Sequence, residues 1–418
     1  MLSPLRIQDR LFYGWVVVIT CLIVGTIVFG TRYSFGVFFK SLEGEFGLTR
    51  GATSGVFSVY MLLCCAFAIL GGWALDRYGP RIVTLLMGSF TCLSLLLTSQ
   101  TNSPWQLFIS YGLLLAIGTG PGYIVVMSTA SRWFEKKRGL ALGIAGSGAG
   151  LGTLVMAPFA TYLISSFGWR MSFIVMGLIA LFFLVSLSRL LKKDPHEIGA
   201  LPDGLKPDSG EMGVRDKRDD AQPVSFSLSQ AFRTRSFWFL GIIWLLWSLC
   251  LHLVLTHLVP HATDIGISAM KAAVALSLIG GVSIPARLLV GWASDRIGRK
   301  VSAVICALLQ AGAMVWLLWS QDLWMFYLFA VIFGFGYGGL DPPITALIGD
   351  IFGVRNIGII MGALIIGWAL GAAIGPIIGG LIFDVSNSYS MAFLTGALAM
   401  LVASLLAALI RPGAKRNV

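Results

Sequence analysis

The sequence predicts an all-α membrane protein with twelve transmembrane helices in two pseudo-symmetric six-helix bundles. Three observations predict this fold class: an apolar composition, twelve long apolar stretches, and a charged motif that occurs once in each half. Of the 418 residues, 57% are hydrophobic and only 12% are charged, whereas a soluble protein contains about 25% charged residues. An apolar excess of this size is expected to face lipid.

Twelve apolar stretches each approach the roughly 20 residues that a helix needs to cross a bilayer. They lie near residues 13–39, 51–74, 82–100, 105–130, 138–163, 169–191, 236–260, 270–293, 300–320, 324–348, 354–383 and 388–410. Most connections are short, which predicts antiparallel neighbours. The exception is a long polar and charged segment. We therefore expect an N-terminal bundle over residues 1–191, a cytoplasmic linker over residues 192–235 and a C-terminal bundle over residues 236–418.

The net charge of +11 would suit a nucleic-acid partner, but its distribution argues against one. Most of the lysines and arginines fall in the N-terminal segment, the linker, the C-terminal segment and the alternate loops between them. This asymmetry follows the positive-inside rule and predicts that both termini are cytoplasmic. A cleavable signal-peptide pattern and glycosylation sequons are absent from the sequence. We expect a multi-pass protein of the cell inner (plasma) membrane.

The repeated motif reads GWALDRYGPR at residues 72–81 and GWASDRIGRK at residues 291–300. A charged, glycine-containing turn at matching places in two apolar halves indicates an internal duplication. This motif resembles the loop motif of the major facilitator superfamily of transporters. We expect its charged residues to gate the cytoplasmic helix ends, bridging them in one conformation and releasing them in the other. These gating candidates are Asp76, Arg77, Asp295 and Arg296.

A second motif begins at Phe134 and reads FEKKRGLALGIA. It resembles the signature F-x-[KR]-[KR]-R-x-L-A-x-G-x-A of the monocarboxylate transporter family, which has the oxalate/formate exchanger family as a close neighbour. The resemblance extends over the whole chain and implies transport of a small organic anion. Independently of it, the spacing of small residues predicts close helix packing. The glycines concerned are Gly143, Gly146, Gly148, Gly150 and Gly152.

Arg287 is the strongest candidate for binding an anion. It lies near the middle of the predicted span 270–293, where a charge is costly and by default marks a functional site. A guanidinium suits a carboxylate because two parallel N–H donors meet two oxygens. The resemblance agrees, since family members have an arginine in the eighth span that engages substrate. A structural arginine whose side chain extends to the membrane surface remains the alternative.

Asp341 is our candidate for the proton site. The resemblance implies an aspartate four residues before Arg287, but Ser283 occupies that position. Asp341 lies four residues after Tyr337, which places both on one helix face. His252 is a second candidate, because histidine titrates near neutral pH. Pro342 and Pro343 follow Asp341, so a structural role at a helix bend stays open.

The other substrate-site candidates are less specific. Tyr123 and Tyr337 offer phenolic hydrogen bonds, although tyrosines within spans also serve packing or the interface. Trp368 is expected to form an apolar wall of the site. Arg32, in the outer half of the first span, is expected to draw anions into an outward-open cavity. The span 354–383 contains no lysine, so one mid-membrane cation favours a monocarboxylate over a dicarboxylate, unless Arg32 supplies a second charge.

These observations predict a proton-coupled symporter of lactate- or pyruvate-like monocarboxylates that works by alternating access. Its partners would be the anion, a proton and the lipid bilayer, and it would function as a monomer. A carboxylate exchanger without proton coupling is the alternative within transport, and a carboxylate sensor that signals through the linker is a further one. We expect no enzymatic activity, cofactor or metal site, because no catalytic or nucleotide-binding motif occurs in the sequence.

Overall fold

A computed structural model describes residues 12–134, 137–198, 226–353 and 357–410. Within these ranges the regular structure is helical and contains no strand. The N-terminal helices are α1 (Tyr13–Tyr33), α2 (Phe35–Phe46), α3 (Arg50–Ser99), α4 (Pro104–Leu107), a π-helical stretch (Phe108–Leu114), α5 (Leu115–Thr119), α6 (Gly122–Trp133), α7 (Arg138–Gly146) and α8 (Gly148–Ser188). The remaining helices are a 3-10 turn (Pro195–Ile198), α9 (Leu228–Phe232), α10 (Arg235–Asp264), α11 (Ala269–Ile297), α12 (Arg299–Leu317), α13 (Leu323–Phe352), α14 (Ile357–Ser386) and α15 (Ser390–Leu409).

Ten helical segments of the described chain are long and apolar enough to cross a membrane, judged by length and composition. The shortest of them has 19 residues and the two longest have 50. As one straight rod, 50 residues would extend about 75 Å, which is more than twice the ~30 Å hydrocarbon core of a bilayer. The two longest segments therefore cannot each be a single straight crossing.

Both of these long segments contain one residue with a non-helical backbone. Gly79 has φ 81° and ψ 167° in α3, and Gly168 has φ 78° and ψ 165° in α8. A positive φ is accessible to glycine because it lacks a Cβ. Pro80 follows Gly79 and begins the next helical segment, the position where proline is favoured. Each glycine lies between two of the apolar stretches that the sequence predicts.

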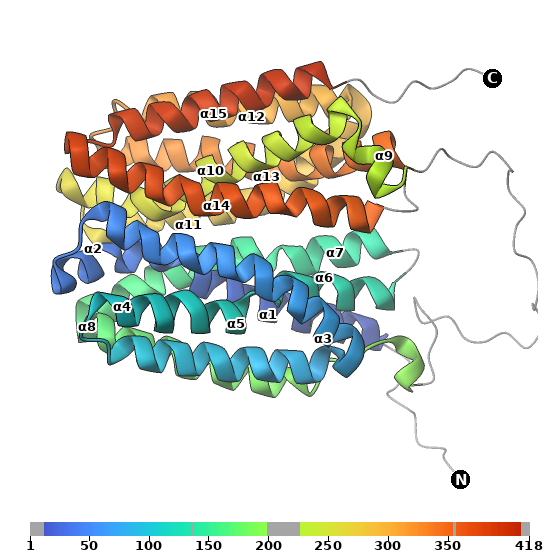
Figure 1. The fold of residues 1–418 in the computed structure, drawn as a ribbon, viewed down its shortest axis with the longest axis horizontal. Coiled ribbons are helices and arrows are strands. Elements are labelled where there is room, and N and C mark those ends of the chain that lie inside the picture. Colours follow the sequence, from blue (N-terminus) through green and yellow to red (C-terminus); the bar gives the residue numbers. More distant parts are fainter. Residues whose placement is uncertain (1–11, 135–136, 199–225, 354–356, 411–418) are drawn as a thin grey trace, which may run out of the picture.

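The helices form two groups that lie side by side (Figure 1). The N-terminal group comprises α1 to α8, in which α8 packs against α1 and α3. The C-terminal group comprises α10 to α15, in which α10 packs on α14, and α12 on both α13 and α15. Between the groups, α3 contacts α14, α8 contacts α11, and α2 contacts α10. The predicted bundle boundaries at residues 191 and 236 stay predictions.

The bundle has two distinct ends. Helix α1 begins and α15 finishes at one end, together with α9, and we call this the terminal end (Figure 1). Helix α2 lies at the opposite end, which we call the far end. The first predicted span, residues 13–39, is observed as α1 and α2 together, with a break at Ser34. The structure thus extends this segment to Phe46, past the predicted boundary.

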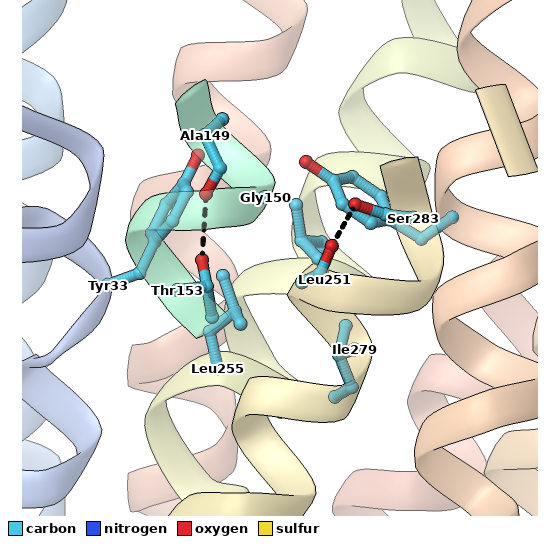
Figure 2. A pocket seen from close by; sticks show the side chains of 10 residues that line it. Tyr33, Ala149, Gly150, Thr153, Leu251, Leu255, Ile279 and Ser283 are labelled. Atoms are coloured by element: carbon cyan, nitrogen blue, oxygen red, sulfur yellow. Dashed lines mark hydrogen bonds between the residues drawn. The ribbon is translucent and has the colours of Figure 1, made fainter. Parts of the chain in front are cut away.

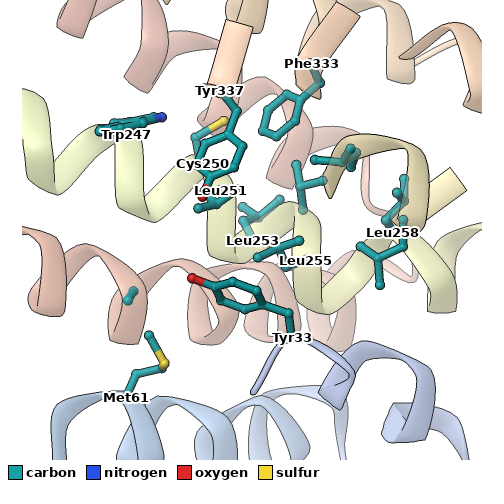
Figure 3. Close-up of a cluster of buried hydrophobic side chains, with 14 of the residues drawn as sticks. Tyr33, Met61, Trp247, Cys250, Leu251, Leu253, Leu255, Leu258, Phe333 and Tyr337 are labelled. Atoms are coloured by element: carbon teal, nitrogen blue, oxygen red, sulfur yellow. The ribbon is translucent and has the colours of Figure 1, made fainter. Parts of the chain in front are cut away.

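The buried apolar side chains form two clusters. One large cluster contains residues of both groups, including Tyr33 and Met61 of the N-terminal group and Trp247 and Tyr337 of the C-terminal group (Figure 3). A second cluster is confined to the N-terminal group and includes Trp133, near the terminal end. One continuous apolar core therefore joins the two groups.

Close contacts between helices, both between the two groups and within one group, depend on glycine. A Cβ atom on Gly150 of α8 would lie 2.7 Å from the carbonyl oxygen of Gly280 in α11, and one on Gly280 would lie 2.6 Å from the carbonyl oxygen of Gly150. Gly148 and Gly152 approach the backbone of α1 equally closely. The predicted role of small residues in helix packing thus applies to these three glycines of α8. It is wrong for Gly143, where a Cβ would meet no atom within 4 Å.

Candidate functional site

Arg287 on α11 and Asp341 on α13 form a loose ion pair. The Nε atom of Arg287 is 3.9 Å from Oδ2 of Asp341, which exceeds the usual hydrogen-bond distance of about 2.7–3.2 Å. Its Nη1 atom is 3.4 Å from the carbonyl oxygen of Gly146 in the N-terminal group. Among the described residues, Nε is buried and has no hydrogen-bond acceptor. The guanidinium therefore keeps donor capacity that an anionic ligand can use.

Both charged side chains remain partly accessible although they lie well inside long apolar helices. The exposed fraction is 23% for the Arg287 side chain and 40% for that of Asp341. A charge this deep in a span is costly unless it meets water or an opposite charge. Partial exposure between the two helix groups fits a position where a ligand can exchange with solvent.

Three tyrosines surround the arginine. The guanidinium of Arg287 lies 5.8 Å from the ring centroid of Tyr337, and Tyr123 and Tyr33 of the N-terminal group are near enough to interact with it in their ionised forms. Tyr123 is 46% exposed, and it is also near enough to Asp341 for the two negative forms to repel each other. The structure therefore brings the predicted Arg287, Asp341, Tyr337 and Tyr123 into one site formed by both groups. Tyr33 is an additional neighbour that the sequence did not single out.

An aromatic cluster adjoins this site. Trp368 on α14 lies 4.9 Å from the ring of Trp247 and 5.8 Å from that of His252. Trp247 lies 5.8 Å from Tyr337, and its indole nitrogen points toward that tyrosine in Figure 3. The cluster thus connects the predicted Trp368 and His252 with Tyr337. Trp247, which mediates this connection, has no local sequence signal that separates it from other apolar residues of α10.

A small cavity lies between the groups next to Tyr33 and Tyr337. Gly150 and Thr153 of α8 and Leu251 of α10 also line it (Figure 2). Its volume is about 10 Å³, close to the space that one water molecule needs. An organic acid cannot enter this cavity in the present conformation. The groups must separate here before a ligand can contact these side chains.

Arg32 lies in the N-terminal group and is only 8% exposed. Its Nε donates a hydrogen bond to the hydroxyl oxygen of Tyr60 at 3.1 Å, and its Nη2 donates to the carbonyl oxygen of Thr119 at 3.2 Å. Within the described residues it makes no ion pair with an acid. In this conformation it packs inside its own helix group, so its predicted role in an outward-open cavity stays a prediction.

The four gating candidates lie toward the terminal end, and each interacts within its own group. The two acids form ion pairs: Asp76 lies 2.6 Å from a nitrogen of Arg132, and Asp295 lies 3.9 Å from a nitrogen of Arg299. The two arginines lie over tryptophan rings, with 5.6 Å from the Arg77 guanidinium to the ring centroid of Trp73 and 4.0 Å from that of Arg296 to the ring centroid of Trp292. Asp76 and Asp295 have highly exposed side chains, at 74% and 71%. Among the described residues, these four form no bridge between the groups.

The far end, in contrast, is closed by charges that cross between the groups. Arg50 at the start of α3 donates two hydrogen bonds to the carboxylate of Asp264 at the end of α10, at 2.6 Å and 3.0 Å. Lys40 of α2 lies 2.6 Å from the same carboxylate. Asp384 of α14 accepts hydrogen bonds from the backbone N–H groups of Arg50 and Gly51, both at 2.8 Å. Together with Tyr389, whose hydroxyl is 2.7 Å from Arg50, we call these residues the far-end ion cluster.

The sequence analysis did not predict the far-end ion cluster. Arg50, Asp264 and Asp384 lie at helix ends, where charged residues are common and carry no special signal. Arg50 and Asp264 are 214 residues apart, and no local pattern indicates that two such positions meet. The structure adds this cluster as a set of contacts between the groups on the side opposite to the gating candidates.

Comparison with known proteins places the chain in a class. The model of the Major Facilitator Superfamily matches residues 21–308 and 282–417. The chain therefore belongs to this superfamily of membrane transporters. It is 26% identical to Monocarboxylate transporter 12 of Xenopus laevis over 96% of this chain and 89% of that protein. It is 24% identical to the uncharacterized MFS-type transporter YhjX of Escherichia coli (strain K12) over 84% of each chain.

Solved structures show the same fold. The D-xylose–proton symporter superposes with a TM-score of 0.74 at 16% identity, covering 97% of this chain and 99% of that one. A bacterial homologue of the human lysosomal transporter Spinster superposes with a TM-score of 0.71 at 16% identity, covering 95% of each chain. The resemblance to the monocarboxylate transporter family, predicted from the motif at Phe134, is confirmed by the first of these relatives.

Proposed function

We propose that this protein is a proton-coupled symporter of small monocarboxylates that works by alternating access. The loose pair of Arg287 and Asp341 between the two helix groups is the observation that carries the proposal. The relatives named monocarboxylate transporters support the substrate class. With the two segments of α3 and of α8 counted separately, the ten candidate helices supply twelve crossings. The protein would act as a monomer in the cell inner membrane, with both termini cytoplasmic.

The mechanism follows from charge balance in a low-dielectric site. Without ligand, Arg287 and Asp341 neutralise each other. A substrate carboxylate can replace Asp341 at the guanidinium at low cost only when Asp341 has accepted a proton. The empty carrier and the fully loaded carrier are then both neutral at this site. Partly loaded forms contain an uncompensated buried charge, which costs several kcal/mol. Only the neutral forms move readily, so anion and proton cross together.

The conformation described here corresponds in this proposal to the state that is open to the cytoplasm. The far-end ion cluster closes the opposite side, and the gating residues of the repeated motif are apart. In the alternate state we expect the far-end contacts to break. Tyr123, Tyr337 and Trp368 would line the substrate, while Arg32 would face the outward-open cavity. His252 is retained as the second candidate for the proton.

A carboxylate exchanger without proton coupling is the second candidate function. Arg32 favours it, because a buried cation that makes no ion pair with an acid among the described residues can meet a second negative charge of a ligand. Reconstitution into proteoliposomes separates the two. We expect labelled lactate or pyruvate to accumulate when an inward proton gradient is applied, without internal carboxylate. Uptake that requires internal carboxylate and ignores a pH step would instead establish the exchanger.

A further inference from the structure

The neighbours of His252 determine which of its two ring nitrogens is the hydrogen-bond donor. The Nδ1 atom lies 2.9 Å from the backbone carbonyl oxygen of Ser248 and 3.2 Å from the Ser248 hydroxyl oxygen. That hydroxyl donates its own hydrogen to the carbonyl oxygen of Trp368 at 2.6 Å, so it meets Nδ1 as an acceptor. Both neighbours accept, and the hydrogen of a neutral ring is therefore assigned to Nδ1.

The other ring nitrogen is left as an acceptor without a donor. In a neutral imidazole that is protonated at Nδ1, Nε2 carries a lone pair. His252 is 0% exposed, and Nε2 has no hydrogen-bond partner among the described residues. A buried polar atom without a partner destabilises a structure and needs an explanation. Here the missing partner is a hydrogen-bond donor.

The imidazole ring of His252 lies where the two helix groups meet. The imidazole lies 6.0 Å from the ring of Tyr33 and 6.2 Å from that of Phe57, both in the N-terminal group. His252 and Leu255 are three residues apart on α10 and so share a helix face, and Leu255 lines the cavity beside Tyr33. Tyr337 lines the same cavity, and its ring centroid lies 5.8 Å from the Arg287 guanidinium. Separation of the groups would therefore open His252 to the same space as Arg287.

We propose that Nε2 of His252 accepts a hydrogen bond from a hydroxyl group of the transported acid, so that the carrier prefers hydroxy acids to the corresponding oxo acids. This inference rests on the proposed function and names its substrate class more closely. A hydroxyl group can donate to the lone pair of Nε2, whereas a keto oxygen has no hydrogen to donate and meets that lone pair with its own. A site with a buried acceptor rejects the analogue that leaves it unpaired.

Competition in proteoliposomes containing the full-length protein tests this inference. The uptake of labelled lactate is measured in the presence of unlabelled competitor acids. The competitors form two matched pairs whose members differ only in having a hydroxyl or a keto oxygen: lactate and pyruvate, and 3-hydroxybutyrate and acetoacetate. For the wild type we expect the hydroxy acid of each pair to inhibit about tenfold more strongly. His252→Asn keeps an N–H near the Nδ1 position and lacks the Nε2 acceptor, so the ratio of inhibition by the two members of each pair should fall to near unity, whatever the absolute uptake rate of this variant. His252→Gln can place an amide oxygen near the Nε2 position and should restore the preference.

A matched control lies one turn further along α10. The hydroxyl of Thr256 is also buried without a partner among the described residues, and Thr256→Val removes it without touching His252. We expect this variant to keep the wild-type preference. Equal inhibition by both members of each pair in the wild type, or an undiminished preference in His252→Asn, would overturn this inference and leave the proposed function standing. A wild type that takes up no carboxylate would remove the proposed function together with the inference.

Discussion

Arg50 and Asp264 belong to different helix groups and form a two-point ion pair at the far end, with N–O distances of 2.6 Å and 3.0 Å. The guanidinium also lies 3.6 Å from the ring centroid of Phe383. The exposed fraction of the Arg50 side chain is only 7%, so solvent screens the pair weakly. This contact holds the far end closed in the present conformation. The proposed alternating-access mechanism requires it to break in every transport cycle.

We predict that Asp264→Asn shifts the carrier toward the state that is open at the far end. Hydrogen bonds to charged groups contribute about 1.5–3 kcal/mol each, so losing the charged acceptor should raise the open population roughly tenfold or more. The measurement is the labelling rate of Ser54→Cys by an impermeant maleimide added on the far-end side. Ser54 is 0% exposed here and lies next to His257. The single Ser54→Cys variant gives the reference rate.

Glu45→Gln is the matched control for the far-end ion cluster. Glu45 pairs with Arg170 at 2.7 Å, and both residues belong to the N-terminal group. Removing this acid near the same end should leave the labelling rate unchanged. If Asp264→Asn and Glu45→Gln label at the same rate as the reference, the far-end ion cluster does not hold the groups together.

We predict that Gly150→Ala slows transport because α8 and α11 can no longer pack at their present separation. The added Cβ would lie 2.7 Å from a backbone oxygen, which real structures do not tolerate without a shift of the helices. Gly143→Ala is the control, since its Cβ would meet open space and alanine favours a helix by up to about 1 kcal/mol over glycine. Initial uptake rates and thermal unfolding of both variants check this. Equal rates for the two would mean that the close approach is dispensable.

We predict that Asp341→Asn separates proton coupling from anion movement. The amide cannot accept and release a proton, and it leaves Arg287 without its negative partner. Exchange of labelled lactate across the membrane should persist, whereas accumulation driven by an inward proton gradient should fall to the equilibrium level. Undiminished uphill uptake by this variant would contradict the assignment of Asp341 as the proton site and leave His252 as the remaining candidate.

Hydropathy and residue type were enough to predict an all-helical membrane fold and to single out several candidate residues that the structure brings together. The apolar stretches on either side of Gly79 and Gly168 were recognisable because a bilayer demands continuous apolar length. A charge within such a stretch, as at Arg287 and Asp341, is conspicuous for the same reason. The contacts of Trp247 and the far-end ion cluster were not predictable, because they join distant segments through tertiary packing. No local sequence pattern indicates that two distant segments are in contact.

The position of Arg32 illustrates the remaining limit. The sequence indicates a charge within the first span, and the structure gives that charge partners in its own helix group, Tyr60 and Thr119. Which side chains face a cavity depends on the conformational state, and the proposed transport cycle requires at least two such states. The donors that an arginine directs at its neighbours in one state can serve a ligand in the other.

The central claim is that Arg287 binds the carboxylate of the transported acid. The most direct test compares labelled lactate uptake by wild type, Arg287→Lys and the control Arg170→Lys in proteoliposomes at matched protein content. Lysine keeps the charge but cannot offer two parallel donors. Loss of a buried, hydrogen-bonded charge contact costs about 2–5 kcal/mol, so we predict that Arg287→Lys lowers uptake roughly a hundredfold while Arg170→Lys transports normally. Uptake by Arg287→Lys at the wild-type rate would contradict the account.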